Sequence, residues 1–235
     1  DLKTVKSQSV DLGIDVFSLF SDQIQFTELI VNEGDFNVVT DSLGNFSFAI
    51  FKTSDEPSST DSSFKLALNK IKVKNTHVLY QDDASKIKIE TNNTNISGDV
   101  QVTDKFINFE TETDIHSLFF GLDKSVLVDR KPLKGTVNTK VNLDPVSVEF
   151  NENKLLLANL PLRILGKVAM LDKGIDFDLN VKSENASLEN LFSLVPADYQ
   201  KWYEGMTFTG KSNIDLLLKG VMQDSISNPS LNIKL

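Results

Sequence analysis

The sequence contains no cysteine, which excludes both a disulfide framework and a thiolate metal site. Its two histidines, His77 and His116, lie in no nucleophile or zinc signature. No stretch approaches the roughly 18 to 20 consecutive apolar residues of a membrane-spanning helix, and no basic-then-apolar leader opens the chain. The net charge of -9 argues against a phosphate-binding surface, so nucleic acid is not an expected partner.

Acidic residues are frequent but do not form a metal-binding motif. Asp172, Asp176 and Asp178 lack the glycine and the terminal glutamate of a calcium-binding loop. Asp176 and Asp178 also alternate with apolar neighbours, which places them on the solvent face of a strand. We therefore expect no metal, no cofactor and no enzymatic activity.

A repeated pattern is the most informative feature of the chain. The following apolar positions recur about forty residues later, each displaced equally: Ile24-x-Phe26-x-x-Leu29-x-Val31 and Phe36-x-Val38, then Leu66-x-Leu68-x-x-Ile71-x-Val73 and Val78-x-Tyr80. Alternating apolar and polar residues are typical of a strand with one buried and one solvated face. The spacing slips by one residue in each copy, which predicts β-bulges at Thr27–Glu28 and Asn69–Lys70.

The rest of the chain supports a mainly β protein. Alternating runs continue through the middle of the sequence, and we expect residues 160–170 and 175–181 to form a hairpin around Asp172-Lys173-Gly174. After it the period changes, and we expect short helices at 187–195 and 197–204, separated by Pro196. The predicted fold is a long, curved antiparallel sheet built from repeated strand-turn-strand units, with two short helices near 187–204.

The expected organisation has three parts. Residues 1–52 form a first β repeat unit, 53–63 a flexible polar loop, and 64–235 the main β region. In the first part, Val10, Ile14, Phe17 and Phe20 have the spacing of a short helix, and residues 41–50 suggest a hairpin. The alternation continues to the last residue, so we interpret the chain as part of a longer protein.

Several segments follow one another in a distinctive order between Phe64 and Leu235: the unit at 70–82 (KIKVKNTHVLYQD), the proline-ended run 191–196 (LFSLVP), the strand 210–216 (GKSNIDL), Gly220, and 228–231 (NPSL). This order of motifs resembles that of the AsmA-like envelope proteins of Gram-negative bacteria. The resemblance implies a periplasmic protein whose parent is anchored in the inner membrane and whose β units form a groove. Family members act in outer-membrane biogenesis and in phospholipid movement between membranes, and no catalytic residue carries over.

The resemblance and the alternation together suggest an apolar groove that binds phospholipid or another acyl-chain lipid. Membrane contact would come through parts of the parent protein outside this chain. The predicted lining residues are as follows: Ile71, Val73, Val78, Tyr80, Ile87, Ile89, Ile107, Phe109, Ile214, Leu216 and Leu218. Alternation indicates that a side chain is buried, but it does not show whether protein or lipid covers it. For any single residue of this list, packing in an ordinary protein core is therefore the simpler interpretation. The alternative function is a structural or adhesion module that binds envelope proteins through strand edges.

Overall fold

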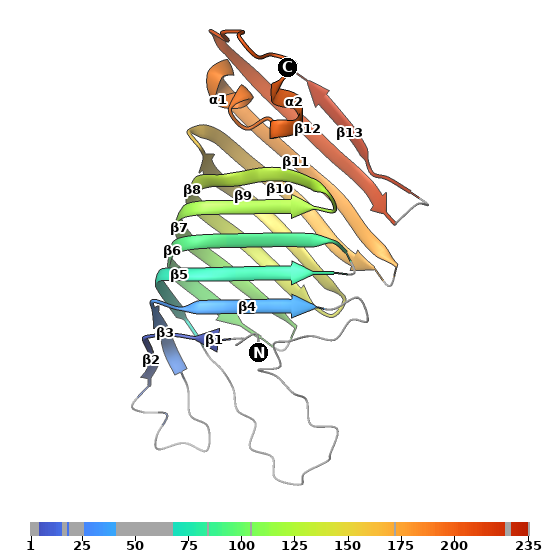
Figure 1. Ribbon diagram of the computed structural model, residues 1–235. Coiled ribbons are helices and arrows are strands. Elements are labelled where there is room, and N and C mark those ends of the chain that lie inside the picture. Colours follow the sequence, from blue (N-terminus) through green and yellow to red (C-terminus); the bar gives the residue numbers. More distant parts are fainter. Residues whose placement is uncertain are drawn as a thin grey trace.

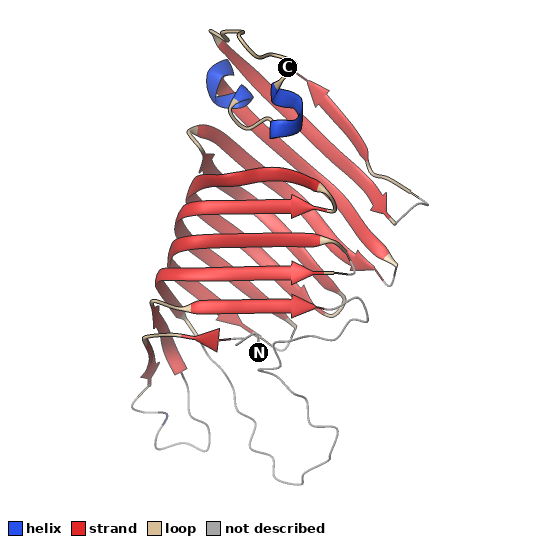
Figure 2. Cartoon of the chain, in the orientation of Figure 1, coloured by secondary structure: helices blue, strands red, loops and turns tan. Residues whose placement is uncertain are grey.

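The computed structural model describes residues 5–15, 18, 26–40, 68–83, 85–103, 105–171, 173–223 and 227–234. They form one continuous sheet with two short helices (Figures 1 and 2). The strands and helices are as follows: β1 (Val5–Lys6), β2 (Ser9–Ile14), β3 (Phe26–Asn32), β4 (Asp35–Thr40), β5 (Lys70–Asp82), β6 (Ile87–Val102), β7 (Phe106–Leu122), β8 (Ser125–Leu143), β9 (Val146–Leu157), β10 (Leu160–Leu171), β11 (Gly174–Ser187), α1 (Leu188–Phe192), α2 (Ala197–Gln200), β12 (Lys211–Met222) and β13 (Ser230–Lys234).

The predicted fold class is confirmed: the protein is mainly β, with one long, open, curved sheet. From β5 to β13 each strand pairs antiparallel with the next along the chain. The hairpin around Asp172–Gly174 is confirmed, since Leu171 pairs with Gly174. Connections this short keep sequence neighbours adjacent in space, and this produces the regular meander.

The repeat in the sequence corresponds to in-register parallel pairing. Strands β3 and β4 both pair with β5, with Val31 beside Val73 and Phe36 beside Val78. The amide of Gly34 donates a hydrogen bond to the hydroxyl of Thr76, which lies 42 residues later in the chain. This distance in sequence is the displacement between the two copies of the repeat. The second copy is therefore one bent strand, β5, and the first copy is a strand interrupted between β3 and β4. Parallel pairing was not expected, because the short spacing within each copy suggested hairpins.

Two local expectations from the sequence are wrong. Residues 9–14 form strand β2, which pairs with β3, although their apolar spacing suggested a helix. The pairing with β3 satisfies the backbone of this segment, so tertiary context overrides the local pattern. The bulge predicted at Thr27–Glu28 is confirmed. The bulge predicted at Asn69–Lys70 is wrong, because β5 only begins at Lys70. In the second copy the strand is bulged around Thr76 instead. The hairpin expected at 41–50 and the loop at 53–63 lie outside the described residues.

The long strands bend where single residues take a left-handed backbone conformation. These residues have φ between 47° and 56°: Glu33, Asn75, Asn93, Arg130, Glu152 and Asn185. Asparagine enters this region more readily than most residues. In Figure 1 the labelled halves of β5 to β8 lie in front of a second layer, and the ribbons turn from one layer into the other along one side.

Asparagine side chains from neighbouring strands satisfy backbone amides at these bends. The Asn95 side-chain oxygen accepts from the amide of Asn75 at 3.2 Å, and that of Asn213 accepts from the amide of Asn185 at 2.9 Å. Asn153, which is buried, accepts from the amide of Asn138 and donates to the Thr139 hydroxyl. These bonds hold the bends by pairing amides that the irregular ladder leaves without a strand partner.

Replacing Asn153 by alanine is expected to lower the free energy of unfolding by roughly 1 to 3 kcal/mol, because it leaves the buried Thr139 hydroxyl and the Asn138 amide without their partner. Urea unfolding followed by circular dichroism measures this change. Asn151→Ala is the matched control, since Asn151 is exposed on the same strand and should change the stability by less than about 0.5 kcal/mol. Equal losses in the two variants would contradict the proposed role of the Asn153 side chain.

The helices lie where the sequence predicted them but are shorter. The Ser187 side chain caps α1 by accepting from the amide of Asn190. After α1 and α2 the chain continues in tight turns rather than α-helix, with the amides of Leu194 and Trp202 bonded three residues back. Pro196, which has no amide hydrogen, separates the two helices.

Candidate functional site: an apolar inner face

Cross-strand pairing places apolar side chains in continuous rows on one face of the sheet. Residues that pair directly across neighbouring strands project to the same face. One row crosses β6 to β13 through the following residues: Val100, Phe109, Thr139, Phe150, Gly166, Leu179, Leu218 and Leu231. No member of this row carries a charge. We call this surface the inner face.

The opposite face, here called the outer face, is polar and charged. An equivalent row crosses the same strands through the following residues: Ser97, Glu112, Thr136, Lys154, Arg163, Lys182, Asp215 and Lys234. Exposed ion pairs such as that between Lys219 and Asp178, at 3.1 Å, also lie on this face. Along these two rows, charged side chains therefore lie only on the outer face.

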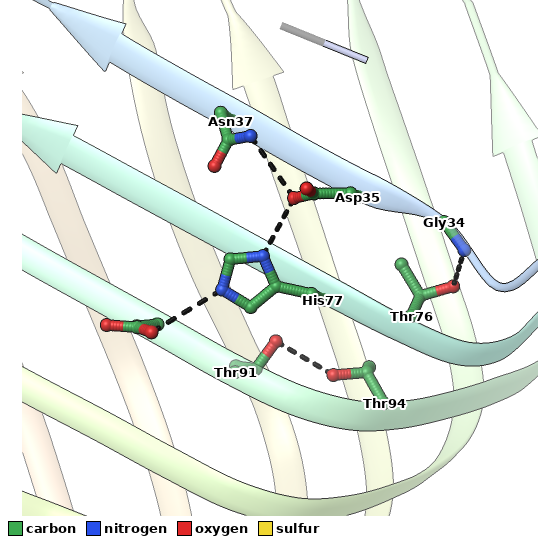
Figure 3. Close-up of polar contacts among 8 residues, drawn as sticks. Gly34, Asp35, Asn37, Thr76, His77, Thr91 and Thr94 are labelled. Carbon is green, nitrogen blue, oxygen red and sulfur yellow. Dashed lines mark hydrogen bonds and ion pairs between the residues drawn. The ribbon is translucent and has the colours of Figure 1, made fainter. Parts of the chain in front are cut away.

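The inner face continues through the bends of the strands. The buried hydroxyls of Thr91 and Thr94 are 2.8 Å apart on β6, so both project to the same side although they are three residues apart (Figure 3). Thr91 pairs with Val78 before the bend, and Thr94 pairs with Ile115 beyond it. The step of three residues at this bulge of β6 thus preserves the face that simple alternation would reverse.

All the residues predicted to line a groove lie on this one face. Val73 pairs with Ile96 and Tyr80 with Ile89, while Leu216 pairs with Val181 at the other end of the sheet. Burial raises the pKa of the Tyr80 hydroxyl, and the charge of Asp82 adds to the rise, so Tyr80 contributes no charge near neutral pH.

Several residues of the same face were not predicted. Sequence reasoning recognised the hairpin formed by β10 and β11 but did not assign its apolar side to the lining. Strands β9 to β11 supply Phe150, Val168, Phe177 and Leu179 to the inner face. Their signal was the same alternation that identified the other lining residues.

The inner face is only partly covered by the protein itself. Every predicted lining residue is half-buried, and on β13 Leu231 and Ile233 are each 55% exposed. Some of the fully buried residues, such as Thr76, Thr94 and Ala186, are small side chains at the bends. In the row from β6 to β13, Val100 and Thr139 are buried whereas the other members keep some exposure, so the described residues cover the row only in part. The inner face is an apolar surface of substantial width that remains accessible.

A separate polar cluster lies on the outer face beside the bend (Figure 3). His77 Nδ1 lies 2.8 Å from Asp35 Oδ1, and its Nε2 lies 3.5 Å from Glu90 Oε1. Partial burial raises the pKa of Glu90, but hydrogen bonds and charge from Lys88 and His77 outweigh it and hold this pKa below its usual value. The cluster therefore ties β4, β5 and β6 together.

Both histidines line a shallow polar hollow of about 690 Å³ beside this cluster. Within the described part of the chain, no group of three or more acidic or histidine side chains is placed to hold a metal ion. None of the helices described there is long and apolar enough to span a bilayer. The inner face, rather than this hollow, is the surface that calls for a functional explanation.

The fold and the inner face define a class of protein: an open β-sheet with one polar and one accessible apolar surface. The chain matches no family model, no curated protein and no solved structure. Its function must therefore be argued from the inner face itself.

Proposed function

We propose that the protein is a non-enzymatic periplasmic component of a bacterial envelope and that its inner face handles or transfers phospholipid between membranes. The observation that carries the proposal is the continuous uncharged row from β6 to β13, in which all members except the buried Val100 and Thr139 remain partly exposed. Each methylene removed from water contributes about 0.8 kcal/mol, so acyl chains would be held without specific polar contacts. The lipid headgroup would stay in water at the open side.

The dimensions of the inner face suit this role. Strands spaced about 4.8 Å apart make the row from β6 to β13 roughly 34 Å long. One leaflet of a bilayer has a hydrocarbon thickness of about 15 Å, half of the membrane core. The row is therefore about twice as long as the hydrocarbon part of one leaflet is thick.

The resemblance to AsmA-like proteins supports the same proposal and supplies the compartment. In this view the parent protein is anchored in the inner membrane, and the segment described here extends into the periplasm. Transfer along the sheet requires no chemical step, which agrees with the apolar composition of the rows.

Lipid binding is tested directly with the whole chain. The purified protein is incubated with envelope phospholipids, re-isolated and extracted for mass spectrometry, and a fluorescent fatty acid is titrated in parallel. We expect lipid to be recovered in stoichiometric amounts and the probe to be shielded from water. Recovery of no lipid together with an unshielded probe would reject the proposal.

One observation favours the alternative, binding of an envelope protein through a strand edge. Among the described residues β13 pairs only with β12, and every residue of β13 is exposed. An unpaired edge can accept a strand from another chain. This function predicts that the lipid-free protein can still be cross-linked through β13 to a partner protein.

A further inference from the structure

The chain between β11 and β12 forms a compact unit that carries exposed aromatic side chains. We call residues 188–210 the helical cap. It contains α1 and α2 and lies at the end of the sheet opposite β1 to β3 (Figures 1 and 2). Its first residue, Leu188, donates its amide to the carbonyl of Gly210, so the cap begins and ends at the same point.

The cap has its own packed interior. The rings of Phe192 and Phe208 stack with centroids 3.6 Å apart, and the ring of Tyr203 meets both edge-on. The Tyr203 hydroxyl donates to the carbonyl of Phe192 at 3.0 Å. These contacts account for the stability of the cap without its outermost side chains.

Three large side chains project from the cap into solvent. Trp202 is 74% exposed, Met206 62% and Tyr199 49%. The rings of Tyr199 and Trp202 meet edge-to-face with centroids 5.3 Å apart, so they form one patch. Large apolar side chains this exposed contribute no burial free energy to the fold. Their exposure indicates a surface that is covered when the protein acts.

We propose that this patch inserts into the interfacial region of a lipid bilayer and seats that end of the inner face on a membrane. The inference rests on the proposed lipid-handling function and adds the place where the membrane is met. Tryptophan and tyrosine favour the headgroup level of a bilayer, because each combines an apolar ring with a polar tip.

Two further observations fit a membrane. Directly after the cap, β12 contributes Ile214, Leu216 and Leu218 to the inner face, so a lipid leaving the bilayer there would meet the apolar rows at once. The cap, residues 188–210, contains three acidic residues and one basic residue, so its net charge is -2. A negatively charged cap is not attracted to anionic lipid, and it should bind zwitterionic bilayers by insertion rather than anionic ones by attraction.

Trp202 is the only tryptophan in the sequence, so its fluorescence reports on the patch alone. With the whole chain and vesicles of phosphatidylcholine, we expect the emission to move to shorter wavelength and to be quenched by lipids brominated near the headgroup. Raising the salt concentration should leave the effect unchanged. Unshifted emission, or binding that depends on anionic lipid and disappears in salt, would overturn the proposal.

Variants separate the patch from apolar surface in general. Tyr199→Ser combined with Met206→Ser should weaken vesicle binding at least about tenfold, a loss of about 1.4 kcal/mol. Leu156→Ser combined with Leu165→Ser removes exposed apolar side chains from the outer face and should leave it unchanged. Equal losses in both double variants would contradict a specific role for the cap.

The test also distinguishes this proposal from the lipid-binding function. The Tyr199→Ser, Met206→Ser variant should still shield a fluorescent fatty acid, because the inner face is intact. Conversely, Leu218→Asp on the inner face should retain the vesicle-induced shift of Trp202. A shift lost in Leu218→Asp would show that Trp202 senses lipid held on the inner face and not the bilayer.

Discussion

Leu179→Asp is expected to weaken lipid binding about 10- to 50-fold, whereas Leu165→Asp leaves it unchanged. Leu179 lies in the middle of the inner-face row, directly opposite Gly166. Leu165 is the residue before Gly166 and projects to the outer face, where it is 40% exposed. The two variants introduce the same charge on neighbouring strands and differ in the face that receives it.

The size of the expected loss in lipid affinity follows from the acyl-chain methylenes that Leu179 would cover. A carboxylate cannot replace the leucine contacts, so two or three methylenes lose their cover at about 0.8 kcal/mol each, and each 1.4 kcal/mol is a factor of ten in affinity. Titration with a fluorescent fatty acid and mass spectrometry of co-purified phospholipid both measure the loss. Leu218→Asp, closer to the end of the row, should behave in the same way.

Thermal unfolding of each variant shows whether the sheet is intact. Leu179 is half-buried, so some loss of stability is expected, and binding is compared at a temperature where all variants are folded. Lipid affinity that falls equally in Leu165→Asp and Leu179→Asp would mean that the inner face is not the binding surface. Affinity unchanged in both would place the lipid elsewhere.

Gly135→Ala is expected to destabilise the protein by roughly 2 to 5 kcal/mol, the combined cost of a strained φ and of overpacking. Gly135 has φ of 140°, and a Cβ atom there would lie 2.1 Å from the carbonyl oxygen of Lys154 and 2.9 Å from Cα of Leu155. Both atoms belong to the backbone of β9, so the β8–β9 ladder itself would have to move. Urea unfolding measures the loss.

Gly205→Ala is the control that separates strain from collision. Gly205 also has a positive φ, 79°, but a Cβ atom there would meet nothing within 4 Å. Its replacement should cost only about 1 kcal/mol, the penalty of the backbone conformation. If the two variants lost the same stability, close approach of β8 and β9 would not be what requires glycine at position 135.

The two faces of the sheet could be predicted from sequence because they depend on local geometry. Successive side chains of a strand point to opposite sides, so the alternation around Phe109 or Leu216 assigns each residue to a face without knowledge of its neighbours. The turn before Gly174 and the helix start at Ser187 are likewise local, since a few backbone groups decide each of them.

The bends and the partners of each strand could not be predicted in this way. Asn75, Asn93 and Asn185 each bend a strand, yet the sequence contains many other asparagines that do not. Residues 9–14 read as helical until β3 is available to pair with them. In both cases the deciding interaction comes from another strand.

The amino-acid sequence by itself determined most of the strands from β5 onward, the alternation of their sides and the two short helices, because each depends on residues close together in the chain. Only the tertiary structure decided that β3 and β4 run parallel to β5, that bulges carry one face across the bends, and that the apolar rows stay half-covered. Those features depend on hydrogen bonds and packing between distant segments, and no local pattern records which segments will meet.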